Sequence, residues 1–102
     1  MLGHMVYFTL KDNSQAAIDA MIAACKKHLS GHPGTVLFAA GTRVPDLLRD
    51  VNDREFDIAL QVVFESRQTH DQYQVHERHR QFIEENRGNW AKVRVFDADV
   101  TS

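Results

Sequence analysis

The segment FDIALQVVFE, residues 56–65, is the clearest strand in the chain, and the fold can be worked out from it in both directions. Large apolar side chains alternate there with smaller or polar ones: Phe56, Ile58, Leu60, Val62 and Phe64 against Asp57, Ala59, Gln61 and Val63. Alternation with a period of two places the large side chains on one face of a sheet. We therefore predict a strand over residues 56–65 with one strongly apolar face.

The residues before this segment predict two more strands and a helix. Residues 2–10 and 35–42 both alternate as strands do. Between them an apolar stripe recurs at helical spacing, preceded by capping residues at 12–15 and followed by Gly31 and Pro33. The stripe comprises Ile18, Met21, Ile22, Cys25 and Leu29. Cys25 is therefore expected to be a buried and unreactive core residue.

The residues after the segment predict a second helix and a last strand. The helix is expected to run unbroken from Ser66 or Thr69 to Asn86, and the strand over residues 91–98. The order β-α-β-β-α-β is that of a ferredoxin-like α+β fold with a four-stranded antiparallel sheet. Two helices cover only one face of such a sheet, so we expect the other face to pair with a second copy of the chain in a homodimer.

Length and composition restrict the class of protein. A chain of 102 residues is expected to form a single domain over residues 1–102. The net charge of -2 gives no basic surface for nucleic acid, and no apolar run is long enough to span a membrane. The single Cys25 excludes an internal disulfide and is typical of a reducing compartment, so a cytoplasmic location is expected.

Histidines are the residues most able to carry chemistry here. At 100° per residue, His79 lies in one apolar arc of the second helix with Val75, Phe82 and Ile83. An imidazole aimed at a sheet is either a hydrogen-bonded core residue or a general acid or base, and both interpretations stay open. His4 lies on the predicted apolar face of the first strand, where it is either a solvated residue near the chain start or shares a space with His79.

Two further candidates are Tyr73 and His76. Tyr73 could act with His79 as a proton donor, but on an unbroken helix the two side chains point about 120° apart. His76 and His79 are three residues apart, a spacing that can present two imidazoles to a metal, but no third ligand accompanies them. The sequence therefore predicts no metal and no cofactor.

These residues and the order of elements together resemble the stress-responsive dimeric α/β-barrel family. The resemblance covers nearly the whole chain. It rests on His4, on Phe64-Glu65, on Tyr73 with His76 and His79, and on Phe96-Asp97. It implies a ferredoxin-like protomer whose sheet packs on that of a partner to form a barrel.

A plant member of this family cyclises a linear polyketide without a cofactor, using a Tyr/His pair that Tyr73 and His79 match. The cyclase-type members have a proline between the two histidines where this chain has Glu77, and a histidine where it has Ile58. By this resemblance His79 and Tyr73 would be catalytic. His4, which could line the same space, is the third catalytic candidate, and a small apolar ligand is expected to contact His76, Phe8, Ile58 and Phe82.

Three functions are compatible with this sequence. The first is a non-catalytic homodimer whose cavity between sheet and helices binds a small apolar ligand or is filled by side chains. The second is a cofactor-free polyketide cyclase or aldol-type lyase, with His79 as base and Tyr73 or His4 orienting an oxygen. The third is a cofactor-independent or haem-linked oxygenase, by analogy with other proteins of this architecture.

Overall fold

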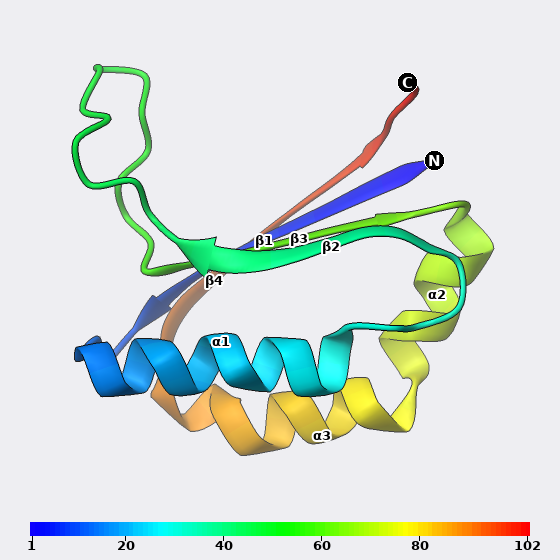
Figure 1. Ribbon diagram of the computed structural model, residues 1–102, viewed down its shortest axis with the longest axis horizontal. Helices are drawn as coiled ribbons and strands as arrows, with labels where there is room; N and C mark the ends of the chain where they lie inside the picture. The colour runs from blue at the N-terminus through cyan, green and yellow to red at the C-terminus, as the bar shows by residue number, and fades with distance from the viewer.

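The computed structural model describes all residues from Met1 to Ser102 and has the predicted α+β architecture. A four-stranded antiparallel sheet forms one layer and the helices form the other (Figure 1). The strands are β1 (Leu2–Leu10), β2 (Thr35–Thr42), β3 (Ile58–Phe64) and β4 (Trp90–Asp99), arranged in the order β2-β3-β1-β4. The helices are α1 (Gln15–Leu29), α2 (Arg67–Val75) and α3 (Glu77–Asn86), with a 3₁₀ turn at Arg87–Asn89.

The core lies between the sheet and the helices, as the strand alternation predicts. The apolar face of β3 and one face of β1 point into it, and α1 contributes its predicted stripe. Cys25 is completely buried there, which confirms its expected place in the core. Fully or nearly fully buried side chains are Leu29, Ile58, Leu60, Val62, Phe64, Tyr73 and Cys25.

The predicted second helix is wrong in one respect, because it is two helices. α2 ends at Val75, and His76 has an extended backbone with φ −68° and ψ 144°. The backbone N–H of His76 donates to the carbonyl oxygen of Tyr73 (3.2 Å), while its side-chain Nδ1 accepts from the backbone N–H of Arg78 (3.1 Å). This imidazole caps the start of α3, so the side chain itself stabilises the break. Figure 1 shows α2 running steeply to α3 as a result.

The break changes which residues of this region face the sheet. Val75, expected in the apolar arc, is 85% exposed at the end of α2. His79 and Phe82 keep their inward orientation on α3, where Phe82 is buried and His79 half-buried. The helical arc calculated for residues 66–86 therefore holds only after residue 76.

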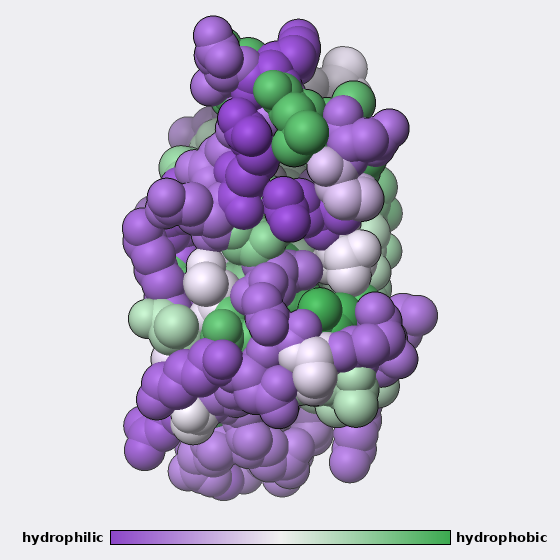
Figure 2. Space-filling model, turned by 90° about the vertical axis from the view of Figure 1, so that its left-hand side faces the viewer, coloured by the Kyte–Doolittle hydropathy of each residue, from purple (hydrophilic) through white to green (hydrophobic).

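All three helices lie on one face of the sheet, and the opposite face carries none (Figure 1). Met5 and Tyr7 of β1 lie on it beside Phe96 and Arg94 of β4. Phe96 is 53% exposed, and Leu37 of β2 is also exposed. The connection between β2 and β3, residues 43–57, rises over one end of this face (Figure 1). From that end the surface is mostly hydrophilic with a few separate apolar patches (Figure 2), and no helix is long and apolar enough to cross a membrane.

Candidate functional site

Tyr73 is at the centre of a cluster of aromatic rings between α2 and the sheet. Its side chain is 2% exposed, and its hydroxyl has no hydrogen-bond partner within the protein. Four rings surround it at centroid distances of 4.8 Å for His79, 4.9 Å for Phe64, 5.0 Å for His32 and 6.0 Å for His4. A buried hydroxyl without a partner is unusual, because its desolvation is not compensated.

The helix break at His76 is what brings Tyr73 and His79 together. On one continuous helix their side chains would diverge by about 120°. With α3 starting afresh at Glu77, the two rings meet edge to face with an angle of 71° between their planes. His4, Tyr73 and His79 are therefore neighbours, although they come from β1, α2 and α3.

Burial controls the protonation of this pair. It lowers the pKa of His79 to about 4, with smaller contributions from the charges of His4, His32 and His70. Burial raises the pKa of Tyr73 well above its usual value of 10. Burial also lowers the pKa of His32, although a hydrogen bond to the backbone of His28 opposes the shift. At neutral pH His79 is thus an uncharged imidazole beside a protonated phenol.

His4 is held by two polar partners on the helix side of the sheet. It lies opposite Asp97 in the pairing of β1 with β4, and its Nδ1 is 2.5 Å from Asp97 Oδ1. The side-chain amide of Gln74 donates to His4 Nε2 at 3.3 Å. With Nε2 accepting, the ring proton is on Nδ1 and is donated to Asp97.

Sequence reasoning did not find His70, Gln74, His32 and the partner role of Asp97. His70 packs against the ring of His4 at 5.1 Å, and Gln74 is one helical turn further along α2. Their i, i+4 spacing could have revealed a polar face on this helix. The contact of Asp97 with His4 depends on strand register, which no local pattern in the sequence gives.

The other residues predicted to contact a ligand lie in the core or at the helix break. Phe8, Ile58 and Phe82 are buried in the core, and the rings of Phe8 and Phe82 are 6.2 Å apart. His76 is exposed at the helix break, where it packs edge to face on His32 at 4.8 Å.

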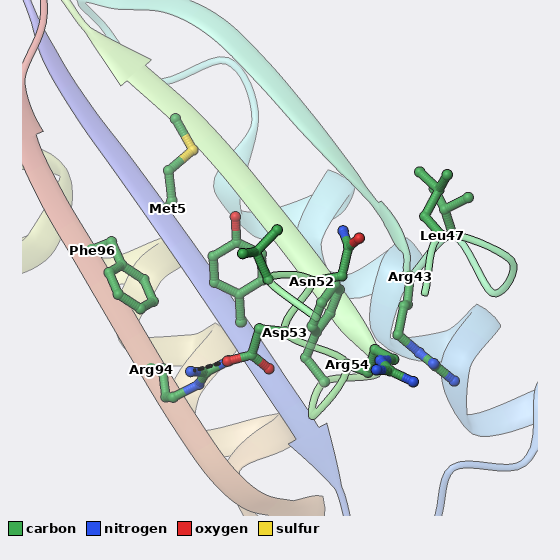
Figure 3. Close-up of a pocket in the computed structure, with 12 residues that line it drawn as sticks. Met5, Arg43, Leu47, Asn52, Asp53, Arg54, Arg94 and Phe96 are labelled. Carbon is green, nitrogen blue, oxygen red and sulfur yellow. Dashed lines mark ion pairs between the residues drawn. The ribbon is translucent and has the colours of Figure 1, made fainter. Parts of the chain in front are cut away.

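A pocket of about 470 Å³ lies on the opposite, open face of the sheet and includes none of the residues predicted for the site. Met5 and Phe96 form its floor, and the β2–β3 connection forms its side (Figure 3). An ion pair joins Arg94 and Asp53 at 2.6 Å, whereas Arg43 and Arg54 have no ion pair. The remaining lining residues are Tyr7, Val44, Leu47, Val51, Asn52 and Phe56.

Comparison with known families identifies the fold and the family. The family model for the stress-responsive A/B barrel domain matches residues 2–100. The chain belongs to this family. The predicted ferredoxin-like fold is also that of its structural neighbours. No curated protein matches the chain in sequence.

Three similar solved structures illustrate the range of the fold. A protein from Arabidopsis thaliana, At3g17210, is 22% identical, with a TM-score of 0.81 over 100% of this chain and 97% of its own. A dimeric ferredoxin-like protein from Thermobifida fusca is 17% identical, with a TM-score of 0.80 over 97% and 90%. The hydroxynitrile lyase from Passiflora edulis is 24% identical, with a TM-score of 0.77 over 98% and 93%. At these identities the likeness shows the shared fold.

Proposed function

We propose that this protein catalyses a cofactor-free proton transfer on a small carbonyl compound, with the Tyr73–His79 pair as its reacting groups. The observation that carries the proposal is the contact of the two rings across the helix break, together with the unpartnered hydroxyl of Tyr73. A substrate oxygen would supply the hydrogen bond that this hydroxyl lacks. One of the structural neighbours, from Passiflora edulis, is a hydroxynitrile lyase.

The protonation of the pair gives each residue a role. Neutral His79 can accept a proton from a carbon next to a carbonyl or from a hydroxyl group. Tyr73 stays protonated, so it can donate a hydrogen bond to the oxygen on which negative charge develops. His4, held by Asp97 and Gln74, packs edge to face on the Tyr73 ring at 6.0 Å and would help to hold that ring in place. Because the ring of Phe64 packs on Tyr73 at 4.9 Å, only a small substrate would fit beside this pair.

The experiment is a proton-exchange assay that does not require the natural substrate. Small ketones and hydroxyketones are incubated with the protein in D₂O, and loss of the α-proton signals is followed by NMR. Mandelonitrile cleavage, followed by the absorbance of benzaldehyde, adds a lyase substrate. His79→Ala and Tyr73→Phe should each slow the reaction by about 10²–10⁴-fold.

A matched control comes from His28, a histidine on the first helix. His28→Gln alters an imidazole that contacts Glu85 at 2.8 Å and has no ring contact with Tyr73, so it should retain activity. Exchange that is no faster with wild type than with His79→Ala, across the whole panel, would refute the proposal.

We also propose that the chain forms a homodimer through its open sheet face. The exposed apolar side chains of this face and the dimeric neighbour from Thermobifida fusca support this assembly. Sedimentation should give twice the 11.7 kDa mass of the chain. Phe96→Glu should dissociate the dimer, whereas Val75→Glu, at an exposed apolar residue on the helix side, should leave it intact. A monomeric wild type contradicts this assembly.

A second candidate function is the binding, in the open-face pocket, of a small carboxylate with an apolar aryl or alkyl group. Its volume of about 470 Å³ is within the range of ligand sites, and Arg43 and Arg54 are cations without an ion pair beside an apolar floor. In the dimer the partner's sheet would form the remaining wall. Aryl and alkyl carboxylates should raise the melting temperature of wild type but not of Arg43→Gln/Arg54→Gln, and equal effects on both would exclude this function.

A further inference from the structure

Three side chains from three different elements converge beside the Tyr73 cluster. They are His4 of β1, His70 of α2 and Asp97 of β4, and one nitrogen or oxygen atom of each lies within 4.8 Å of the others. Asp97 Oδ1 is shared between them, at 2.5 Å from His4 Nδ1 and 4.0 Å from His70 Nε2. Residues 4, 70 and 97 are far apart in the sequence, so this triad exists only in the folded chain.

We propose that this triad binds a divalent transition-metal ion of the Zn²⁺ type. Two imidazoles and one carboxylate are a donor set that holds zinc and other first-row metals in proteins. Metal–nitrogen bonds of about 2.0–2.1 Å place neighbouring donors of a tetrahedral ion about 3.3 Å apart. The distances of 2.5 Å and 4.0 Å lie on either side of that value, and all three ligand atoms are within 4.8 Å of one another, so the site would form by rotation of these side chains.

His70 is already oriented as a metal ligand. Its Nδ1 contacts Asp71 Oδ1 at 2.9 Å, and Asp71 is in turn held by Arg67 at 2.8 Å. A carboxylate on one ring nitrogen fixes the other nitrogen as the free donor, which is the usual arrangement around metal-bound histidines. Here that other nitrogen, Nε2, is the one nearest Asp97, and its only other contact is a long one with the Gln74 amide at 3.5 Å.

His4 becomes a ligand by changing its tautomer. Its Nδ1 proton is donated to Asp97, and a metal ion placed between the two atoms takes the place of that proton, which is replaced by one taken up on Nε2, so that the ring stays neutral. The ring then carries its proton on Nε2, where it needs an acceptor. Gln74 is already in contact with His4 Nε2 at 3.3 Å and His70 Nε2 at 3.5 Å, and half a turn of its amide presents its oxygen to His4.

The burial of the triad suits a site that is fixed on one side and open on the other. The side chains of His4 and His70 are 5% and 12% exposed, whereas that of Asp97 is 45% exposed. An ion can therefore enter past Asp97, and a water molecule can take the fourth position. A bound ion would join α2 to the two strands β1 and β4, so it should stabilise the folded chain.

Calorimetric titration of the protein with ZnCl₂ tests this proposal, using a chain purified without a histidine tag. Wild type should bind one ion per chain, and the bound ion should raise its melting temperature. His70→Ala and Asp97→Asn should weaken binding at least tenfold, and Asp71→Asn, which removes only the support of His70, by about 10–100-fold. These residues are on the outer side of the cluster, and circular dichroism checks that each variant folds.

The chain supplies its own control in the pair His28–Glu85. This pair is also a buried histidine on a carboxylate, at 2.8 Å, but it has no third ligand. Glu85→Gln should bind zinc as wild type does, and Mg²⁺, which prefers oxygen ligands, should give no heat. Binding that is absent in wild type, or that is equal in wild type, His70→Ala and Asp97→Asn, overturns the site. Because Tyr73 and His79 are not ligands, loss of proton-exchange activity in their variants does not bear on this result.

Discussion

Replacing Tyr73 by phenylalanine should stabilise the protein while removing its proposed activity. The hydroxyl is buried, its residue is 2% exposed, and it has no protein partner, so folding takes it out of water without compensation. Such a group costs about 1–3 kcal/mol. The phenyl ring keeps the contacts with Phe64, His32 and His79, so little packing is lost. We expect Tyr73→Phe to raise the free energy of unfolding by about 1–2 kcal/mol.

Urea denaturation followed by circular dichroism measures this change, at one fixed protein concentration because oligomer stability depends on concentration. In thermal unfolding each kcal/mol gained would raise the melting temperature by about 4–8 °C for a chain of this size. Thr35→Val is a companion variant, since Thr35 Oγ1 is the other buried hydroxyl without a partner; it should also stabilise the fold but leave activity intact. A Tyr73→Phe variant less stable than wild type would refute the reasoning, because it would show that the hydroxyl is hydrogen-bonded.

Three further predictions follow from the helix break, the core and the histidines. Glu77→Pro should change the free energy of unfolding by less than about 1 kcal/mol, because residue 77 is the first of α3 and His76 before it is extended. In an unbroken helix the same proline would cost about 3 kcal/mol or more. Chemical denaturation distinguishes these two outcomes. Cys25, whose pKa burial raises to about 12, should react with a thiol reagent only after unfolding, and fast labelling of native protein would contradict its place in the core. Because the pKa of His79 in the folded protein lies below its unfolded value of 6.5, the stability of the fold should be full above pH 6.5 and should fall towards pH 4. The fall should be less steep in His79→Gln. Urea midpoints measured across this pH range test the prediction, and an equal pH dependence in wild type and variant would contradict it.

The sequence predicted the layers of this fold because its strands and first helix are strongly periodic. Residues 35–42 form β2 as predicted, and the first helix begins at Gln15 after Ser14, one of the expected capping residues. The strand predicted at 56–65 is shorter, Ile58–Phe64, since Asp57 uses its carboxylate to accept from the backbone N–H of Leu10.

The site could be predicted only in part, because its geometry depends on one backbone residue and on strand register. Helical periodicity continues through residues 66–86, and nothing in it indicates that the His76 imidazole would cap a new helix. That single extended residue turns Tyr73 towards His79. Asp97 and His70 meet His4 only through the pairing of β1 with β4 and the packing of α2, which are tertiary features.

The protonation of His79 is the most direct test of the proposed site. A two-dimensional ¹H–¹³C NMR titration of the imidazole signals, with His79 assigned by comparison with His79→Gln, gives its pKa in the native protein. A half-buried ring against Tyr73 should titrate near pH 4 and stay neutral at pH 7, as a general base requires. A pKa of 6.5 or above would show that His79 is solvated, and the Tyr73–His79 site would then be contradicted.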